Sequence, residues 1–138
     1  MQPEQLDSTL RAFQESRILL TAIELNIFTF LGGGTTASEA ASRMGADPRA
    51  TRMLLDALVS LDLIEKHGEV YSNTDLSARL LVASSPESTR AAMLHDVHRW
   101  RTWSNLTGRI RGEAPPEEHR TLDTERHRAL LAMLDRKS

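Results

Sequence analysis

The sequence predicts a mostly α-helical protein with one small β-hairpin. Leucine and alanine dominate the apolar residues of the 138-residue chain, and aromatic residues make up only 4% of it. Such a composition favours helices over sheets. Apolar residues also recur at steps of three and four along most of the chain, which is the spacing of one helix face. Only a short stretch around Gly68 has the residues typical of two strands joined by a turn.

The first apolar stripe predicts an amphipathic helix that ends near Leu31. Arg17 interrupts this stripe, so one break is expected within it. Gly32, Gly33 and Gly34 follow a helix rather than a strand, and they lack the spacing and the lysine of a phosphate loop. We interpret them as a linker. The members of the stripe are Leu6, Leu10, Phe13, Leu20, Ile23 and Ile27.

Two helices are predicted after the glycines, the first of them short. Thr36 and Glu39 have the spacing of a capping box, which predicts a helix over Ser38–Met44 that ends at Gly45. Asp47-Pro48 predicts the start of a second helix, with Asp47 as its N-cap. The buried face of this second helix is predicted to comprise Ala50, Met53, Leu54, Ala57, Leu58 and Leu61.

A β-hairpin over Ile64–His67 and Glu69–Ser72 follows the second helix. Two helices joined by a tight turn and followed by a hairpin make a winged helix. The predicted fold class is therefore a mostly α, winged-helix-like domain whose only sheet is the hairpin, or wing.

Three further helices are predicted after the wing. A short one spans Thr74–Leu81, and Ser85-Pro86 begins a long one that nothing interrupts before Gly112. A loop from Gly112 to about Arg120 then leads to a last helix over about Asp123–Leu134. The apolar residues of the long helix have the near-heptad spacing of a helix that lies along another helix. They are Met93, Val97, Trp100, Trp103, Leu106 and Ile110.

We divide the chain into three parts of one domain. Residues 1–34 form the N-terminal helices, residues 35–73 the winged-helix core, and residues 74–138 the C-terminal helices with the long helix.

Composition excludes several classes of function. The net charge of −2 gives no general attraction to nucleic acid or to anionic membranes. The absence of cysteine excludes disulfides, thiolate metal sites and a cysteine nucleophile. No apolar run approaches the length that spans a bilayer. We expect a soluble, cytoplasmic protein.

A DNA-binding transcription regulator is the alternative function that a winged helix suggests. From Asp47 to Ser72, however, five acidic residues outnumber three basic ones, and Glu65 and Glu69 flank the tip of the wing. These carboxylates would repel the phosphates that a DNA-binding wing contacts. A small-molecule-binding accessory protein that uses a pocket among the helices is a further alternative.

The sequence predicts neither a metal site nor a catalytic residue. His95 and His98 are three residues apart, but a closed zinc site needs further ligands, and His119 and His127 do not supply them at a recognisable spacing. No hydroxyl residue has the flanks of a nucleophile elbow, and Glu117-Glu118 lies in a polar loop. Trp100 and Trp103 are interpreted as core or interface anchors, with a ligand-lining role as the alternative for Trp103.

The order of these features resembles the N-terminal part of class I S-adenosylmethionine-dependent O-methyltransferases. That family includes bacterial enzymes that tailor polyketides in secondary metabolism, and the hydroxyindole and plant O-methyltransferases. A family pattern of Trp, Leu, a basic residue and Gly is matched by Trp103, Leu106, Arg111 and Gly112, and Met133 lies where an Ala-Met pair precedes the catalytic domain. The matching stretches are Leu19–Phe30, Ala37–Gly45, Thr51–Ile64, Tyr71–Leu76 and Trp100–Gly112.

The resemblance implies a dimerisation and substrate-pocket module. In the family this module forms an intertwined homodimer and supplies one wall of the substrate pocket. The pocket or interface residues implied here are Phe13, Trp100, Trp103 and Leu106. The dimer-interface residues are Leu6, Leu10, Phe13, Leu20, Met93 and Val97.

The resemblance also implies that the cofactor is bound elsewhere. In the family a Rossmann-like domain with a Gly-rich loop, an acidic ribose partner and often a catalytic histidine follows this module. We expect the present chain to stop before that domain, to bind no cofactor and to be inactive alone. S-adenosylmethionine is expected only in a full-length parent or in a partner that supplies the catalytic domain.

Overall fold

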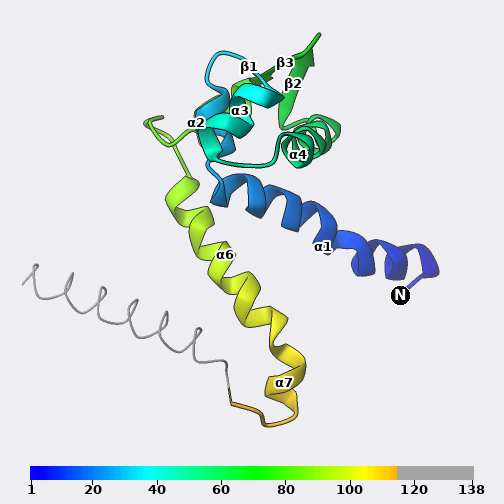
Figure 1. Ribbon diagram of the computed structural model, residues 1–138. Coiled ribbons are helices and arrows are strands. Elements are labelled where there is room, and N and C mark those ends of the chain that lie inside the picture. The colour runs from blue at the N-terminus through cyan, green and yellow to red at the C-terminus, as the bar shows by residue number, and fades with distance from the viewer. Residues whose placement is uncertain (115–138) are drawn as a thin grey trace, which may run out of the picture. The chain divides into compact units, whose positions relative to one another are not determined.

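The computed structural model describes residues 1–114, which form helices and a small antiparallel sheet (Figure 1). The mostly α fold with a β wing is therefore confirmed. The chain divides into two compact units, Met1–Val97 and a second one that begins at His98, and each is described by itself. The helix predicted over Asp123–Leu134 and most of the loop before it lie outside the described residues. The elements are α1 (Pro3–Glu24), α2 (Ile27–Leu31), β1 (Thr35–Thr36), α3 (Ala37–Met44), α4 (Pro48–Ser60), β2 (Ile64–His67), β3 (Val70–Asn73), α5 (Asp75–Leu80), α6 (Arg90–Ser104) and α7 (Leu106–Ile110).

The first apolar stripe forms two helices, but the break is not at Arg17. Helix α1 continues through Arg17, whose guanidinium lies 3.4 Å from the carboxylate of Glu24. The break comes at Asn26, which has a φ of 58° in the left-handed region that asparagine tolerates better than most residues. Asn26 Oδ1 then accepts a hydrogen bond from the Thr29 hydroxyl at 2.8 Å, in the first turn of α2.

The three glycines form a turn between α2 and β1, as predicted. The backbone N–H of Gly34 donates to the carbonyl of Leu31 at 2.8 Å, which closes the turn. Gly34 has a φ of 141°, and a Cβ there would lie 3.0 Å from a methyl group of Val70. Glycine therefore permits both the backbone conformation and the close packing of this segment against β3.

The starts of α3 and α4 follow the predicted caps, with one difference. The Thr36 hydroxyl accepts from the backbone N–H of Glu39 at 3.2 Å, and the Asp47 carboxylate accepts from that of Ala50 at 2.8 Å. The predicted return bond from the Glu39 side chain to Thr36 is wrong. That carboxylate accepts instead from the hydroxyl of Thr35, at 2.7 Å. The predicted stop of α3 is confirmed, because Gly45 has a left-handed φ of 65°.

The buried face of α4 is only partly the one that the spacing predicted. Leu58 is fully buried, but Ala50 is exposed, and 66% of the Met53 surface is exposed. Thr51 and Leu55 are buried in their place. The prediction failed because α4 packs against α3, α1 and β2, so residues on several sides of the helix are covered.

The wing has one strand more than predicted. Its sheet has the order β1-β3-β2, and both pairs are antiparallel. Strands β2 and β3 form the predicted hairpin, and β3 begins and ends one residue later than expected. In their register Lys66 lies opposite Tyr71. Strand β1 pairs Thr35 with Tyr71. A strand of two residues carries no alternation that a sequence pattern can reveal, so β1 was missed.

The hydrophobic core lies where the end of α1, α2, α4 and the sheet meet. Its fully buried residues include Ile23, Phe28, Leu55 and Leu58, and Tyr71 closes it from β3. The side-chain amide of Asn73 donates to the carbonyls of Phe28, at 2.9 Å, and Gly32, at 3.3 Å. These bonds hold β3 against α2.

The predicted long helix begins later than expected and has a break. Ser85 does not cap it, because the Ser85 hydroxyl donates to the Arg79 carbonyl at 2.6 Å and closes a turn after α5. Helix α6 begins at Arg90 and ends at Ser104, and α7 resumes at Leu106. At the break, the side-chain amide of Asn105 donates to the Arg101 carbonyl at 3.0 Å. Such side-chain bonds compete with the helical backbone bonds.

Candidate functional site

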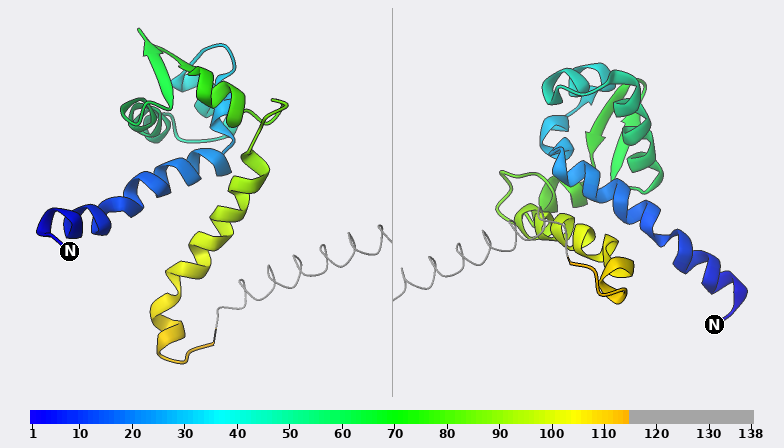
Figure 2. Two further views of the ribbon diagram at one scale, coloured as in Figure 1. Left: turned by 180° about the vertical axis from the view of Figure 1, so that it is seen from behind. Right: turned by 60° about the horizontal axis from the view of Figure 1, so that its bottom comes forward.

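The first four turns of α1 are uncovered by the rest of the described chain. All residues from Met1 to Ser16 are exposed, and the first turns of the helix lead away from the sheet and from α2–α4 (Figures 1 and 2). Three apolar side chains follow one face of this segment, with 61% of Leu6, 69% of Leu10 and 53% of Phe13 exposed. An apolar stripe on an uncovered helix favours contact with a partner.

Other predicted interface residues are covered within one copy of the chain. Leu20 and Met93 are half-buried, and Met93 packs against the core. Val97 is buried, so it offers little surface to a partner. The uncovered part of the predicted interface is therefore Leu6, Leu10 and Phe13, which we call the α1 stripe.

The predicted pocket residues of the second unit lie on α6 and α7. Trp100 is half-buried, whereas 64% of Trp103 and 46% of Leu106 are exposed. Ile110, one turn after Leu106, is 80% exposed. Phe13 belongs to the first unit, and its participation in a common pocket with the tryptophans stays a prediction.

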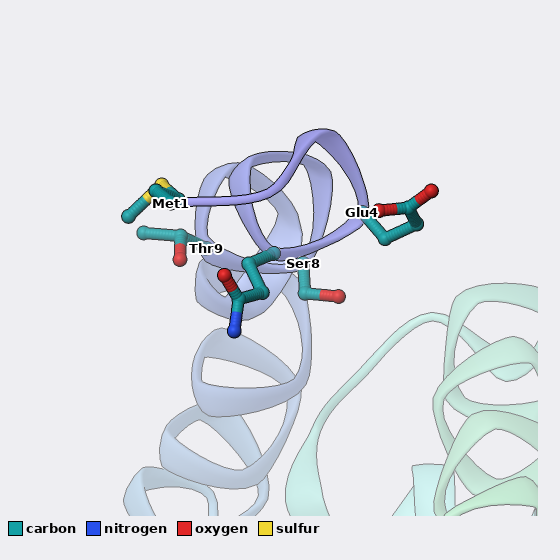
Figure 3. A pocket seen from close by; sticks show the side chains of 5 residues that line it. Met1, Glu4, Ser8 and Thr9 are labelled. Atoms are coloured by element: carbon teal, nitrogen blue, oxygen red, sulfur yellow. The ribbon is translucent and has the colours of Figure 1, made fainter.

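A hollow on the surface of α1 is too open to hold a small molecule. Figure 3 shows it beside the first turns of the helix. Its lining residues come from this one helix and from the chain start just before it: Met1, Glu4, Gln5, Ser8 and Thr9. Ligand sites enclose most of their ligand between several elements, and this hollow does not.

A polar contact joins the wing to α4. The buried ring of Tyr71 on β3 carries a hydroxyl that donates to Asp56 Oδ1 on α4 at 2.5 Å. Lys66 Nζ lies 3.4 Å from the same oxygen and 5.1 Å from the centre of the Tyr71 ring. The Tyr71 hydrogen bond, assisted by Lys66, lowers the pKa of Asp56. Burial raises the pKa of Tyr71, so its hydroxyl stays protonated and able to donate.

Basic side chains of α4 and the wing lie beside carboxylates. Arg52 on α4 lies 3.7 Å from Glu69, and Nε2 of His67 lies 3.5 Å from the carboxylate of Glu65. Lys66 likewise lies beside Asp56, so the cations that face the hairpin are paired with carboxylates rather than presented to DNA phosphates. The geometry thus offers no support for a DNA-binding role.

Metal-binding and membrane-spanning features are also absent from residues 1–114. No group of three or more metal-ligating side chains gathers there. Within the same residues, no helix is both long enough and apolar enough to cross a membrane. His119 and His127, considered as further zinc ligands, lie outside the described residues.

Sequence reasoning missed Arg90, which connects α6 to α1. Its Nη2 donates to the carbonyl of Ile23 at 3.1 Å, and this carbonyl is in the last turn of α1. A cation there is favourable because the carbonyls at a helix C-terminus carry partial negative charge. The two residues are 67 positions apart in sequence, and no local pattern marks such a contact.

Comparison with known proteins identifies the family. Residues 8–83 match the family model of the O-methyltransferase dimerisation domain. The chain belongs to this family. The matched range includes Leu10 and Phe13 of the α1 stripe, and it continues through the entire wing.

Curated relatives are methyltransferases of bacteria and animals. The chain is 39% identical to the tetracenomycin polyketide synthesis 8-O-methyl transferase of Streptomyces glaucescens over 72% of the chain and 30% of the relative. It is 34% identical to the acetylserotonin O-methyltransferase of Rattus norvegicus over 77% of the chain and 25% of the relative. The chain thus spans less than a third of the length of either relative.

A solved structure extends the likeness to the fold. The human N-acetylserotonin methyltransferase, solved in complex with SAM, superposes with a TM-score of 0.68 and 29% sequence identity. The match covers 78% of the present chain and 34% of that protein. The predicted resemblance to the dimerisation region of O-methyltransferases is confirmed, and nothing in these relatives points to a transcription regulator.

Proposed function

We propose that this dimerisation domain pairs two copies of an S-adenosylmethionine-dependent O-methyltransferase and forms one wall of its substrate pocket. The observation that carries the proposal is the uncovered α1 stripe. Most helical stability in proteins comes from packing of an apolar face, and the first four turns of α1 have no such packing within the described chain. Covering Leu6, Leu10 and Phe13 with a second copy provides that packing.

The proposed substrate class is a small aromatic molecule with a hydroxyl group, of the polyketide type. The names of two relatives support this, because tetracenomycin polyketide synthesis and acetylserotonin both point to aromatic acceptors. Trp103 and Leu106 supply exposed apolar surface that suits the face of such a ring. The domain that holds the cofactor would supply the remaining walls of the pocket and so determine how the ring lies against Trp103 and Leu106.

The residues described here do not fit the cofactor. The glycine segment follows a helix, and Gly34 packs against Val70, so this segment does not form an open cradle for a nucleotide. We therefore expect methyl transfer to need a cofactor domain that the described residues do not form. We place the S-adenosylmethionine site in another segment of a longer parent or in a partner chain.

Sedimentation of the chain tests the proposed dimer. We expect a concentration-dependent equilibrium with a dimer predominating at micromolar concentration, because burial of the stripe by a partner removes apolar surface from water. Analytical ultracentrifugation across a concentration series measures this equilibrium. A chain that remains a monomer at several hundred micromolar would contradict the proposal.

Titration with S-adenosylmethionine tests the placement of the cofactor site. We expect no heat of binding in calorimetry with the isolated chain at cofactor concentrations up to the millimolar range. A full-length methyltransferase with its own cofactor domain serves as the positive control. Binding to this chain at micromolar affinity would overturn the placement and leave the dimer unaffected.

A further inference from the structure

The described part of the second unit is positively charged, whereas the first unit is negatively charged. Residues 98–114 contain four arginines and one acidic residue, Glu113. Residues 1–97 contain eight basic and thirteen acidic side chains. The positive charge thus lies on the segment that also exposes Trp103, Leu106 and Ile110. Such a local concentration of one sign of charge attracts anions even though the chain as a whole is negative.

Trp103, Leu106 and Arg109 form a row along α6 and α7. They are three residues apart, and positions three apart are neighbours on the surface of a helix. The break between the helices keeps the row in line, because the Asn105 N–H donates to the Thr102 carbonyl at 3.2 Å and the Asn105 carbonyl accepts from the Arg109 N–H at 3.0 Å. All three side chains of the row are exposed, so an apolar surface ends in a cation.

Within residues 1–114 the Arg109 guanidinium has no carboxylate partner. By contrast, Arg11, Arg17, Arg52 and Arg79 each pair with a carboxylate, at distances of 3.0, 3.4, 3.7 and 3.3 Å. The planar guanidinium of arginine matches a carboxylate with two parallel hydrogen bonds. Arg109 is therefore available to bind the carboxylate of a ligand that lies on Trp103 and Leu106.

We propose that the substrate of the methyltransferase is an aromatic hydroxy acid whose carboxylate is bound by Arg109. The aromatic ring lies on Trp103 and Leu106, and the acid group extends along the row. Trp103 and Arg109 are six residues apart, which is about 9 Å along a helix axis, so a molecule of two or more fused rings spans the row. This inference rests on the proposed function, since it takes α6 and α7 as a wall of the substrate pocket.

A matched pair of ligands tests the inference on the 138-residue chain. One ligand is a hydroxynaphthoic acid, which is ionised at neutral pH, and the other is its neutral methyl ester. We expect the acid to bind with a dissociation constant in the low millimolar range and the ester about threefold to fivefold more weakly, because exposed charge pairs are individually weak. The shift of the Trp103 indole N–H signal in nuclear magnetic resonance provides the measurement. High salt is expected to weaken binding of the acid alone.

Two substitutions on the same segment locate the cation that binds the acid. Arg109→Gln is expected to lower the affinity for the acid to that for the ester and to leave the affinity for the ester unchanged. The matched control is Arg111→Gln, which removes the same charge from an equally exposed arginine two positions later. Residues two apart do not face the same side of a helix, so this variant is expected to keep most of the preference for the acid.

Equal affinities for the acid and the ester would overturn the inference and leave the aromatic substrate class standing. Equal losses in the two arginine variants would show a general attraction of anions to the segment, and Arg109 would have no special role. If Arg109→Gln raises the dimer dissociation constant in ultracentrifugation, Arg109 serves the interface and the inference is wrong.

One outcome would also contradict part of the proposed function. If neither ligand shifts the Trp103 signal at concentrations up to about 10 mM, α6 and α7 are not a wall of an aromatic pocket. The proposed dimer is measured separately, by sedimentation without any ligand, so its failure is distinguished from the failure of the acid-binding row.

Discussion

Replacing Phe13 with aspartate is expected to convert the dimer into a monomer while the wing remains folded. Phe13 is 53% exposed in one copy and lies outside the core, so the substitution costs the isolated fold little. In a dimer the same substitution removes a buried aromatic side chain and places an unpaired carboxylate against apolar surface, once for each copy. Central aromatic contacts are worth about 2–4 kcal/mol each in protein interfaces. Two of them correspond to a dissociation constant raised about a thousandfold or more.

The control for this substitution is Met53→Asp on α4. Met53 is 66% exposed, so the substitution introduces the same charge at a similarly exposed apolar position outside the α1 stripe. We expect the Met53 variant to dimerise like the original chain and the Phe13 variant to sediment as a folded monomer, which unfolds at a lower temperature because it lacks the stabilisation by a partner. Equal dimerisation of the two variants would show that the α1 stripe is not the interface.

Val97, by contrast, is a poor position for the same test. The near-heptad spacing of the long helix placed Val97 on a contact face, and the structure shows that it is buried within one copy. A buried valine replaced by aspartate unfolds the surrounding structure whether or not a partner is present. Only the exposed members of a predicted stripe can separate association from folding, and exposure is a property of the folded chain.

Local signals in the sequence predicted the ends of elements better than their faces. Asp47-Pro48, Gly45 and Thr74 each act through bonds or dihedral angles within a few residues, and the structure has each of them at a helix end as expected. The true start of α6 at Arg90 coincides with contacts that bring distant segments together, since Arg90 donates to the Ile23 carbonyl. Such contacts leave no periodic trace in the chain.

The same distinction holds for the candidate site. Leu6, Leu10 and Phe13 were found because an apolar stripe on a helix is a local pattern, and their exposure then indicates a surface for a partner. The bond between Tyr71 and Asp56 joins residues 15 positions apart on different elements, and nothing in the spacing of the two marks it. From the sequence, neither residue had a special role: Tyr71 was one residue of the predicted wing, and Asp56 was one residue of the predicted helix before it.

Replacing Tyr71 with alanine is expected to destabilise the domain by about 3–5 kcal/mol, the usual cost of truncating a large buried aromatic side chain. Tyr71 is among the largest fully buried side chains, and its ring closes the core from β3. The matched variant Tyr71→Phe keeps the ring and removes only the hydroxyl that donates to Asp56. We expect it to cost about 1–2 kcal/mol, because Asp56 is half-exposed and water replaces the lost donor in part. Urea denaturation of the three chains measures the free energies of unfolding.

The hydrogen bond from the Tyr71 hydroxyl to Asp56 also makes the free energy of unfolding depend on pH. The pKa of Asp56 is lowered in the folded chain, first by the Tyr71 hydrogen bond and then by Lys66. A lowered pKa contributes stability that is fully present above the ordinary aspartate pKa near 4 and is lost as the pH falls through the folded value. Tyr71→Phe is therefore expected to reduce the free energy of unfolding at pH 7 and to have a progressively smaller effect as the pH falls toward 2–3 and the Asp56 carboxylate takes up a proton. If the difference between the two chains is the same at pH 7 and at pH 2–3, the hydroxyl does not stabilise the charged form of Asp56. The bond would then stabilise the wing only as a neutral contact.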